Sequence, residues 1–264
     1  MNLHLEGHTA LVTGAASGIG LAVARAFAAE RCSLQLWDRD PAVLRVAEEL
    51  ATEYAVAAAG TVVDVTDFDA VNRAVAVGGI DHVVHCAAIG SGKFGFPFTN
   101  LSPADWPRVL EVNVLGTVNV AHAVAPHMVR AGRGTFVFLA SVAGQIGSQT
   151  DPPYSASKAA TINFAQCMAK DLAPHGIRVN TVCPGMVQTP LNRSVWQAWH
   201  DQAPAAERVG YDEWAERKIR AAVPLGRWQS PADVAAMVVF LSSDRAAQVT
   251  GQTVNVDGGF VMHW

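Results

Sequence analysis

The chain has 264 residues, of which 50% are hydrophobic and only 16% are Asp, Glu, Lys or Arg, and its formal net charge is −4. Soluble domains usually carry about 25% charged residues, whereas disordered chains combine low hydrophobicity with high charge, so this composition excludes a disordered protein. The acidic balance excludes nucleic-acid binding by bulk electrostatics. The longest aliphatic run, residues 234–241, is far shorter than the roughly 20 residues that span a bilayer, so we expect no membrane segment.

Short apolar runs alternate with longer amphipathic segments along the whole chain. The predicted strands are residues 8–13, 33–38, 61–64, 80–86, 135–140, 178–183 and 253–256, and the predicted helices are residues 19–31, 41–54, 67–77, 105–130, 154–172 and 231–241. This alternation is typical of βαβ units, whose strands are parallel and covered by helices on both faces. No stretch resembles a linker. We therefore expect an α/β fold: a Rossmann-like, doubly wound parallel sheet in a single domain.

Residues 188–225 interrupt this alternation. The segment is polar, charged and aromatic at once, with Trp196, Trp199 and Trp214, and it is too long for an ordinary connection. We expect a small helical excursion that forms a lid over a substrate site. The alternative is a packed surface insertion that does not move.

A glycine-rich turn, TGAASGIG at residues 13–20, joins the first predicted strand to the first predicted helix. Glycine permits a sharp turn and lets a pyrophosphate approach the N–H groups at the start of the helix. The turn therefore indicates a dinucleotide site, although a purely structural turn remains the alternative.

Two carboxylates follow at the ends of the next predicted strands. Asp38 can accept hydrogen bonds from the adenosine ribose hydroxyls and would repel a 2′-phosphate, which favours NAD. The neighbouring Arg39 leaves NADP open, because a guanidinium can bind that phosphate. Asp64 either accepts a hydrogen bond from the adenine amine or serves as a turn residue.

Four polar residues suggest acid/base chemistry. Tyr154 and Lys158 are spaced i and i+4 on a predicted helix and share a face, where the ammonium would lower the pKa of the phenol. Ser141 follows a strand at the sheet edge where ligands bind, and Asn113 is a polar residue in an apolar helical run. Together with the glycine turn, they predict an active site.

In these motifs the chain resembles the short-chain dehydrogenase/reductase family of the one-domain type. The resemblance rests on TGAASGIG at 13–20, NVLG at 113–116, Ser141, YSASK at 154–158, PG at 184–185 and TGQTVNVDGG at 250–259. It implies that Tyr154 is the general acid/base, that Lys158 assists it and holds the nicotinamide ribose, that Ser141 binds the reacting oxygen, and that Asn113 holds a water in a proton relay. The implied cofactor-binding residues also include Gly14, Ser17, Gly18, Ile19, Gly20, Asp38, Asp64, Val65, Ala87, Pro184, Gly185, Val187 and Thr189.

The chain departs from the family after the fourth predicted strand. The family usually reads NNAG there, and this chain has His85-Cys86-Ala87-Ala88. We expect cofactor binding to survive with a slightly altered backbone at Ala88. His85 is expected to be a core or turn histidine, although it could reach a ligand.

The remaining expectations concern compartment and metal. Residues 1–9 contain no apolar signal core, and Cys32, Cys86, Cys167 and Cys183 show no metal-ligand spacing. We expect a cytoplasmic protein with reduced, buried thiols and no metal site.

The substrate is expected to contact three loops at residues 89–98, 142–153 and 188–225, with Ser91, Gln145, Gln149 and Trp196 as candidates. This polar and aromatic mixture favours an NAD-dependent dehydrogenase of a sugar, polyol or cyclic alcohol. The alternatives are a 3-oxoacyl-thioester reductase and a non-catalytic dinucleotide-binding regulatory protein. The helices at 105–130 and 154–172 are apolar on more than one face, and in the resembling family they form subunit contacts, so we expect a homotetramer without nucleic-acid or membrane partners.

Overall fold

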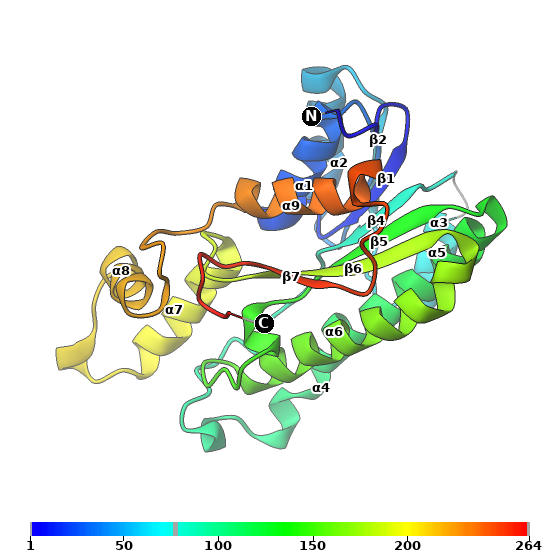
Figure 1. Cartoon of the computed structure of the whole chain (residues 1–264). Helices are drawn as coiled ribbons and strands as arrows, with labels where there is room; N and C mark the ends of the chain where they lie inside the picture. Colours follow the sequence, from blue (N-terminus) through cyan, green and yellow to red (C-terminus); the bar gives the residue numbers. More distant parts are fainter. Residues whose placement is uncertain (1, 76–78, 263–264) are drawn as a thin grey trace.

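The computed structural model describes residues 2–75 and 79–262. Its strands form a parallel sheet in the order β3-β2-β1-β4-β5-β6-β7, which crosses the middle of Figure 1. The strands are β1 Thr9–Thr13, β2 Ser33–Asp38, β3 Ala58–Val62, β4 His82–His85, β5 Gly134–Leu139, β6 Ile177–Pro184 and β7 Thr253–Val256. The winding direction reverses between β1 and β4, where open α/β sheets bind their ligands outside the carboxyl ends of the strands.

Helices cover both faces of the sheet, as the alternating pattern predicts. On one face lie α1 Gly18–Ala29, α2 Ala42–Tyr54 and α9 Pro231–Ser242, whose buried residues form one core with Val12, Leu36 and Val182. On the other face lie α3 Phe68–Val75, α5 Gly116–Ala131 and α6 Pro152–Leu172, which form a second core with Leu11, Phe136 and Val179. In Figure 1, α1 and α9 lie above the sheet and α5 and α6 below it. The predicted doubly wound fold is confirmed.

Two predicted boundaries differ from the structure near the site. The third strand begins and ends earlier than expected because Ala58–Val62 pairs in register with Leu34–Asp38 of β2. Asp64 therefore lies in the turn after β3 rather than at the end of the strand. The predicted helix at 67–77 is observed as α3, and residues 76 and 77 lie outside the described part of the chain.

The helix predicted at 105–130 is not uniform. It consists of α4 Pro107–Leu110, a π-helical turn at Glu111–Leu115, and α5. The helical run Pro103–Ala131 is long and apolar enough to cross a membrane by length and composition, and half of its most apolar window is buried inside the protein. Several of its buried side chains, among them Val120 and Val124, belong to the core between α3, α5 and the sheet. The run is packed as a core helix of this fold.

The interrupting segment is helical, as expected. It contains α7 Pro190–Gln202, a short 3-10 turn at Ala205–Glu207, and α8 Tyr211–Ala222. In Figure 1, α7 and α8 stand apart from the sheet, beyond the carboxyl end of β6. We call α7 and α8 with their connection the lid.

The cysteines are free thiols, but the expectation that all four are buried is wrong. Cys32 and Cys183 are buried and Cys86 is half-buried, whereas Cys167 is exposed. Cys167 lies beside the exposed Gln166 on the side of α6 that faces away from the sheet. An apolar sequence context therefore did not distinguish the two sides of this helix.

Candidate active site

A cavity of about 710 Å³ opens at the carboxyl edge of the sheet and extends beneath the lid. It is lined by the glycine turn, by the segments that follow β2, β3, β4, β5 and β6, and by residues of α7 and α8. The sequence-predicted residues that line it are Gly14, Ser17, Gly18, Ile19, Gly20, Asp38, Asp64, Val65, Ala87, Ser141, Tyr154, Lys158, Pro184, Gly185, Val187 and Thr189. Segments far apart in sequence thus meet around one space.

The glycine turn brings the backbone of β1 against the segment that follows β4. Gly14 has a φ of +67°, and a Cβ there would lie 2.9 Å from the amide nitrogen of Ala87. Helix α1 then begins after Ser17, whose side chain makes no capping hydrogen bond to the first helical turn. Gly18, Ile19 and Gly20 of that turn line the cavity, at the end of the helix where the dipole favours an anion. This cradle fits a pyrophosphate group.

The Asp38 carboxylate is held in place by the backbone. Its Oδ2 accepts a hydrogen bond from Ala16 N at 3.0 Å, and its Oδ1 accepts one from Asp40 N at 3.0 Å. The first bond joins the end of β2 to the glycine turn. Arg39 lines the same cavity and is exposed. Asp64 accepts hydrogen bonds from Thr66 N and Thr66 Oγ1, so it is a turn residue that also lines the cavity.

Tyr154 lies one turn into α6, which is capped by Asp151. Burial raises the pKa of the Tyr154 phenol above its usual value, a hydrogen bond with Ser141 opposes this, and the Asp151 charge raises the pKa further. Ser141 itself is fixed because its Oγ accepts a hydrogen bond from Ala143 N at 3.1 Å. The expected depression of the Tyr154 pKa by Lys158 is therefore not observed within the chain alone.

The Lys158 ammonium is bonded to the backbone at the end of β5. Its Nζ donates a 2.7 Å hydrogen bond to the carbonyl oxygen of Leu139 and lies 5.5 Å from the centre of the Tyr154 ring. Burial lowers the pKa of this ammonium to about 8. Lys158 is thus a buried donor at the cavity wall, tied to the end of β5.

Asn113 occupies the π-helical turn and is buried. Its amide accepts from Ile89 N at 2.8 Å and donates to the carbonyl oxygen of Ile89 and to Ser157 Oγ, both at 2.9 Å. The side chain therefore joins the segment after β4 to the helix of Tyr154. Asn113 does not line the cavity described above, and its place is behind the wall formed by Ile89.

His85 is a core histidine, as expected. It is buried, and its Nδ1 lies 3.0 Å from Thr13 Oγ1, which also accepts hydrogen bonds from Cys86 N and Ala87 N. Ala88 is not among the described residues with positive φ, so the backbone at this position accommodates a side chain.

The four predicted substrate residues lie outside the lining of this cavity. Gln149 lines an adjacent cavity, and the backbone N–H of Ser91 donates a hydrogen bond to Asp151 Oδ2. Gln145 is hydrogen-bonded to Asn255, and Trp196 donates to the carbonyl oxygen of Val209 inside the lid. The structure does not bring these four residues together.

Comparison with known proteins identifies the family. A model of the enoyl-(acyl carrier protein) reductase family matches residues 14–261. The 3-oxoacyl-(acyl-carrier-protein) reductase FabG of Thermotoga maritima is 33% identical over 265 residues, which cover 98% of this chain and 100% of that protein. The sorbitol dehydrogenase of Cereibacter sphaeroides is 35% identical over 263 residues, which cover 97% of this chain and 98% of that protein. The chain belongs to the short-chain dehydrogenase/reductase family.

Solved structures of short-chain dehydrogenases/reductases superpose on nearly the whole chain. The L-sorbose reductase of Gluconobacter frateurii, complexed with NADPH and L-sorbose, has a TM-score of 0.90 at 27% identity and covers 100% of both chains. A gluconate 5-dehydrogenase of Burkholderia cenocepacia with NADP and tartrate has a TM-score of 0.86 at 32% identity, covering 98% of this chain and 97% of its own. A 3-oxoacyl-(acyl-carrier protein) reductase of Brucella melitensis with bound NAD has a TM-score of 0.83 at 33% identity, covering 99% and 95%.

Several residues of this short-chain dehydrogenase/reductase cavity were missed by sequence reasoning. Asp151 lines the cavity and is buried, which raises the pKa of its carboxyl. The signal for it was available, because an Asp before Pro152 is typical of a helix N-cap. Trp214 and Lys218 also line the cavity from α8, and nothing in their local sequence pattern indicates which side of that helix faces the site.

Proposed function

We propose that this chain is an NAD-dependent oxidoreductase that interconverts a secondary alcohol and a ketone. The observation that carries the proposal is that Ser141, Tyr154 and Lys158 line the same cavity as the glycine turn. The proposed proton donor or acceptor therefore shares a cavity with the proposed cradle for a dinucleotide. The wider membership in an oxidoreductase family supports the same reaction class.

In the oxidative direction, the Tyr154 phenolate removes the hydroxyl proton of the substrate while Ser141 donates a hydrogen bond to the same oxygen. The hydride chemistry at the carbinol carbon, in either direction, would be supplied by a nicotinamide dinucleotide when bound. Lys158 would hold the nicotinamide ribose of a bound dinucleotide by donating from Nζ, and in that complex its charge would favour the phenolate, an effect that is absent in the chain alone. The side-chain amide of Asn113 is bonded to Ile89 and Ser157, so its proposed part in the proton relay is to position the segment after β4 against the helix of Tyr154.

For the cofactor, we favour NAD because of Asp38. Its carboxylate is held by two backbone amides, so it cannot easily turn away from a 2′-phosphate. The exposed Arg39 is the competing feature, and the solved relatives include complexes with NAD, NADP and NADPH. Gly14, Ser17, Gly18, Ile19 and Gly20 are proposed to hold the pyrophosphate, Asp64, Val65 and Ala87 the adenosine half, and Pro184, Gly185, Val187 and Thr189 the nicotinamide end.

For the substrate, we propose a hydroxylated compound such as a sugar, a polyol, a cyclic alcohol or a related hydroxy acid. Four polar side chains line the same cavity as Tyr154 and suit substrate hydroxyls: Ser148, Thr150, Asp151 and Asn192. Relatives named sorbitol dehydrogenase, L-sorbose reductase and gluconate 5-dehydrogenase agree with this class. The competing function is 3-oxoacyl-thioester reduction, which the relatives named 3-oxoacyl-(acyl-carrier-protein) reductase favour.

We also propose that the protein acts in the cytoplasm, where the free cysteines would stay reduced. We further propose that it acts as a homotetramer on a small-molecule substrate.

The decisive experiment is turnover with NAD and with NADP against sugars, polyols, aldonic acids, cyclic alcohols and 3-oxoacyl thioesters. We expect NAD-linked turnover of a hydroxylated compound, and we expect Tyr154→Phe to abolish it while dinucleotide binding persists. A strong preference for NADP would refute the argument from Asp38. Unchanged turnover in Tyr154→Phe would refute the mechanism, and no turnover of any compound would favour the regulatory alternative.

A further inference from the structure

A second cavity of about 310 Å³ adjoins the first beneath the lid. Thr150, Trp214 and Lys218 line both cavities, so the two spaces share a boundary. The other residues that line the second cavity are Phe94, Gln149, Trp199, Val209 and Arg217. The proposed active site therefore continues into a compartment that is aromatic and positively charged.

Lys218 is the charged group at this boundary. Its Nζ lies 4.3 Å from the centre of the Trp214 ring, and burial lowers the pKa of the ammonium. None of the ion pairs between described residues includes Lys218, whereas the exposed Arg220 on the same helix pairs with Glu216. A half-buried cation whose contact is an aromatic ring and not a carboxylate is partly uncompensated, and an anionic ligand would compensate it.

The surrounding charges do not provide that compensation. Arg217 adds a second cation to the second cavity and pairs with Glu213, which lies outside its lining. No described acidic side chain lines the second cavity. Asp151 lines the first cavity, and both of its oxygens accept backbone hydrogen bonds, from Tyr154 N and Ser91 N.

We propose that Lys218, supported by Arg217, binds an anionic group of the substrate at the boundary between the two cavities. This inference rests on the proposed function, because it requires the reacting oxygen of the substrate to lie at Tyr154 while the anionic group of the same substrate lies near the lid. Trp214, Trp199 and Phe94 cover the carbon chain near the anion. The substrate is therefore a hydroxy or keto compound with a negative charge some distance from the reacting carbon, rather than a neutral polyol.

Two sources of this charge fit the same chemistry. One is the carboxylate of a small hydroxy acid held entirely within the two cavities. The other is the phosphate of a pantetheine arm that delivers a 3-oxoacyl group from outside. Both would accept charge-assisted hydrogen bonds from the Lys218 ammonium.

Binding to the dinucleotide-loaded protein, measured by calorimetry with two matched pairs of probes, tests the proposal. The pairs are gluconate with sorbitol, and 4′-phosphopantetheine with pantetheine. We expect one anionic probe to bind at least about 10-fold more tightly than its neutral match, as a charge-assisted hydrogen bond predicts. The pair that shows this difference identifies the source of the charge.

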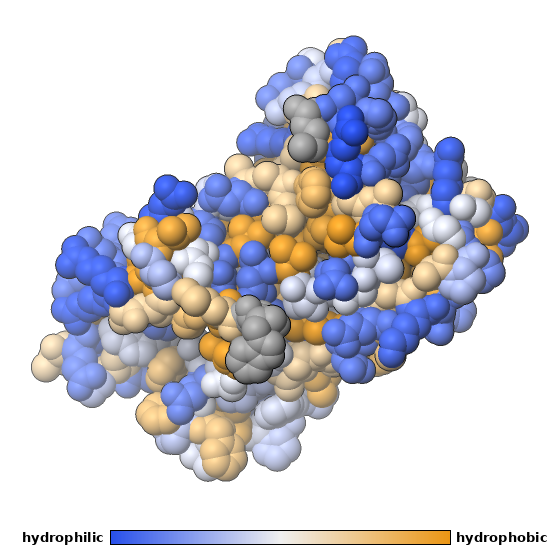
Figure 2. Space-filling model, in the orientation of Figure 1, coloured by the Kyte–Doolittle hydropathy of each residue, from blue (hydrophilic) through white to orange (hydrophobic). Residues whose placement is uncertain are grey.

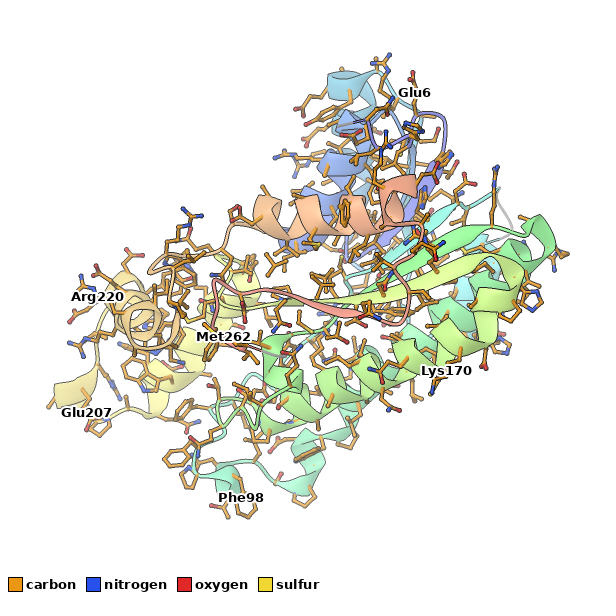
Figure 3. All side chains as sticks on the ribbon, viewed as in Figure 1. Glu6, Phe98, Lys170, Glu207, Arg220 and Met262 are labelled. Atoms are coloured by element: carbon orange, nitrogen blue, oxygen red, sulfur yellow. The ribbon has the colours of Figure 1, made fainter. Side chains whose placement is uncertain are left out.

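Lys218→Met removes the charge but keeps an unbranched side chain over Trp214, and it should abolish the preference for the anion. Arg220→Met is the matched control, because Arg220 lies on the same helix with a side chain that is 74% exposed, at the outer edge of the lid in Figure 3. It should leave the preference intact. In the wild type, added salt should weaken binding of the anion and not of its neutral match.

The proposal is overturned if neither anionic probe binds more tightly than its neutral match. It is equally overturned if Lys218→Met retains the preference. Because binding is measured without turnover, and can be repeated in Tyr154→Phe, these outcomes are independent of whether the proposed reaction occurs. Loss of turnover with preserved anion binding would count against the proposed function alone.

Discussion

At the scale of single residues, His85 shows how a buried polar group is tolerated close to the site. Its Nδ1 is paired with Thr13 Oγ1, and its buried Nε2 has no hydrogen-bond partner among the described residues. Burial, together with the smaller effect of the nearby Lys158 charge, lowers the pKa of His85 to about 3. Folding therefore holds this imidazole in its neutral form.

This arrangement predicts acid-sensitive stability. His82 is also buried and its pKa is likewise lowered to about 3, whereas a histidine in the unfolded chain titrates near about 6.5. Between these two pKa values the unfolded chain binds more protons than the folded chain. The stability that the neutral histidines contribute is therefore fully present above the unfolded-state pKa and is lost as the pH falls towards the folded-state pKa. For each of the two histidines, the free energy of unfolding should fall by about 1.4 kcal/mol for every unit by which the pH is lowered in that window.

Urea unfolding between about pH 7 and about pH 5 measures this slope. His85→Asn introduces the residue usual in the family. It should remove the contribution of one histidine from the pH dependence of the free energy of unfolding, independently of its effect on stability at neutral pH. An unchanged slope in His85→Asn would show that this imidazole does not titrate on unfolding.

Some of the candidate site residues could be predicted from local sequence pattern, and others depend on tertiary packing. Tyr154 and Lys158 were predictable because helical spacing places i and i+4 on one face. Ser141 was predictable because it follows a strand at the ligand-binding edge. Lys218 was not, because a helix of the lid packs by tertiary contacts that local periodicity does not specify.

At the scale of elements, the 3-10 turn at Val142–Gly144 packs directly on α6. A Cβ at Gly144 would lie 2.6 Å from the carbonyl carbon of Lys158 and 2.7 Å from Ala159 N, both backbone atoms. Gly144→Ala should therefore separate Ser141 from Tyr154. We expect a loss of about 1–3 kcal/mol in the free energy of unfolding, together with a lower kcat.

Gly147→Ala provides the control for this prediction. Gly147 follows the same turn, and a Cβ there would meet nothing within 4 Å. Its variant should retain wild-type unfolding and turnover. If Gly144→Ala behaves like Gly147→Ala, the close packing of the turn on α6 does not position Ser141.

The elements themselves were largely predictable from the alternation of apolar and amphipathic segments. The misplaced boundary of β3 reflects pairing with β2, which an isolated apolar run does not reveal. The π-helical turn was not predicted because the apolar periodicity on both sides of it is that of an ordinary α-helix. Its only sequence signal was Asn113, a polar residue in an apolar run.

At the scale of the whole molecule, apolar surface remains uncovered. Leu115, at the start of α5, is 56% exposed, and Figure 2 shows apolar surface gathered over α9 and the β7 edge of the sheet. Leu115 lies in the helical run that is proposed to form subunit contacts, whereas the surface over α9 and β7 lies outside the two helices proposed for these contacts. Leu115→Arg should shift the assembly towards smaller species in light scattering, because a charge would be buried at the contact.

Leu44→Arg is the matched control. Leu44 is 46% exposed on α2, away from the helices expected at the interface, so its variant should keep the wild-type mass. A wild-type protein that remains monomeric at all concentrations would contradict the proposed tetramer. The scarcity of charge in the composition suggested such contacts, but it could not locate them.

The π-helical turn at Glu111–Leu115 also bears on how this chain can vary in length. A π turn takes one extra residue into a helix while the helical segments before and after it keep their faces. Deleting one residue there would leave α5 packed on α3 and would withdraw the Asn113 amide from Ile89 and Ser157. A related chain that is one residue shorter at this place would therefore fold normally and still lack the link between the segment after β4 and the helix of Tyr154. A gap in an alignment at this turn would thus carry functional information that a gap in a surface loop does not.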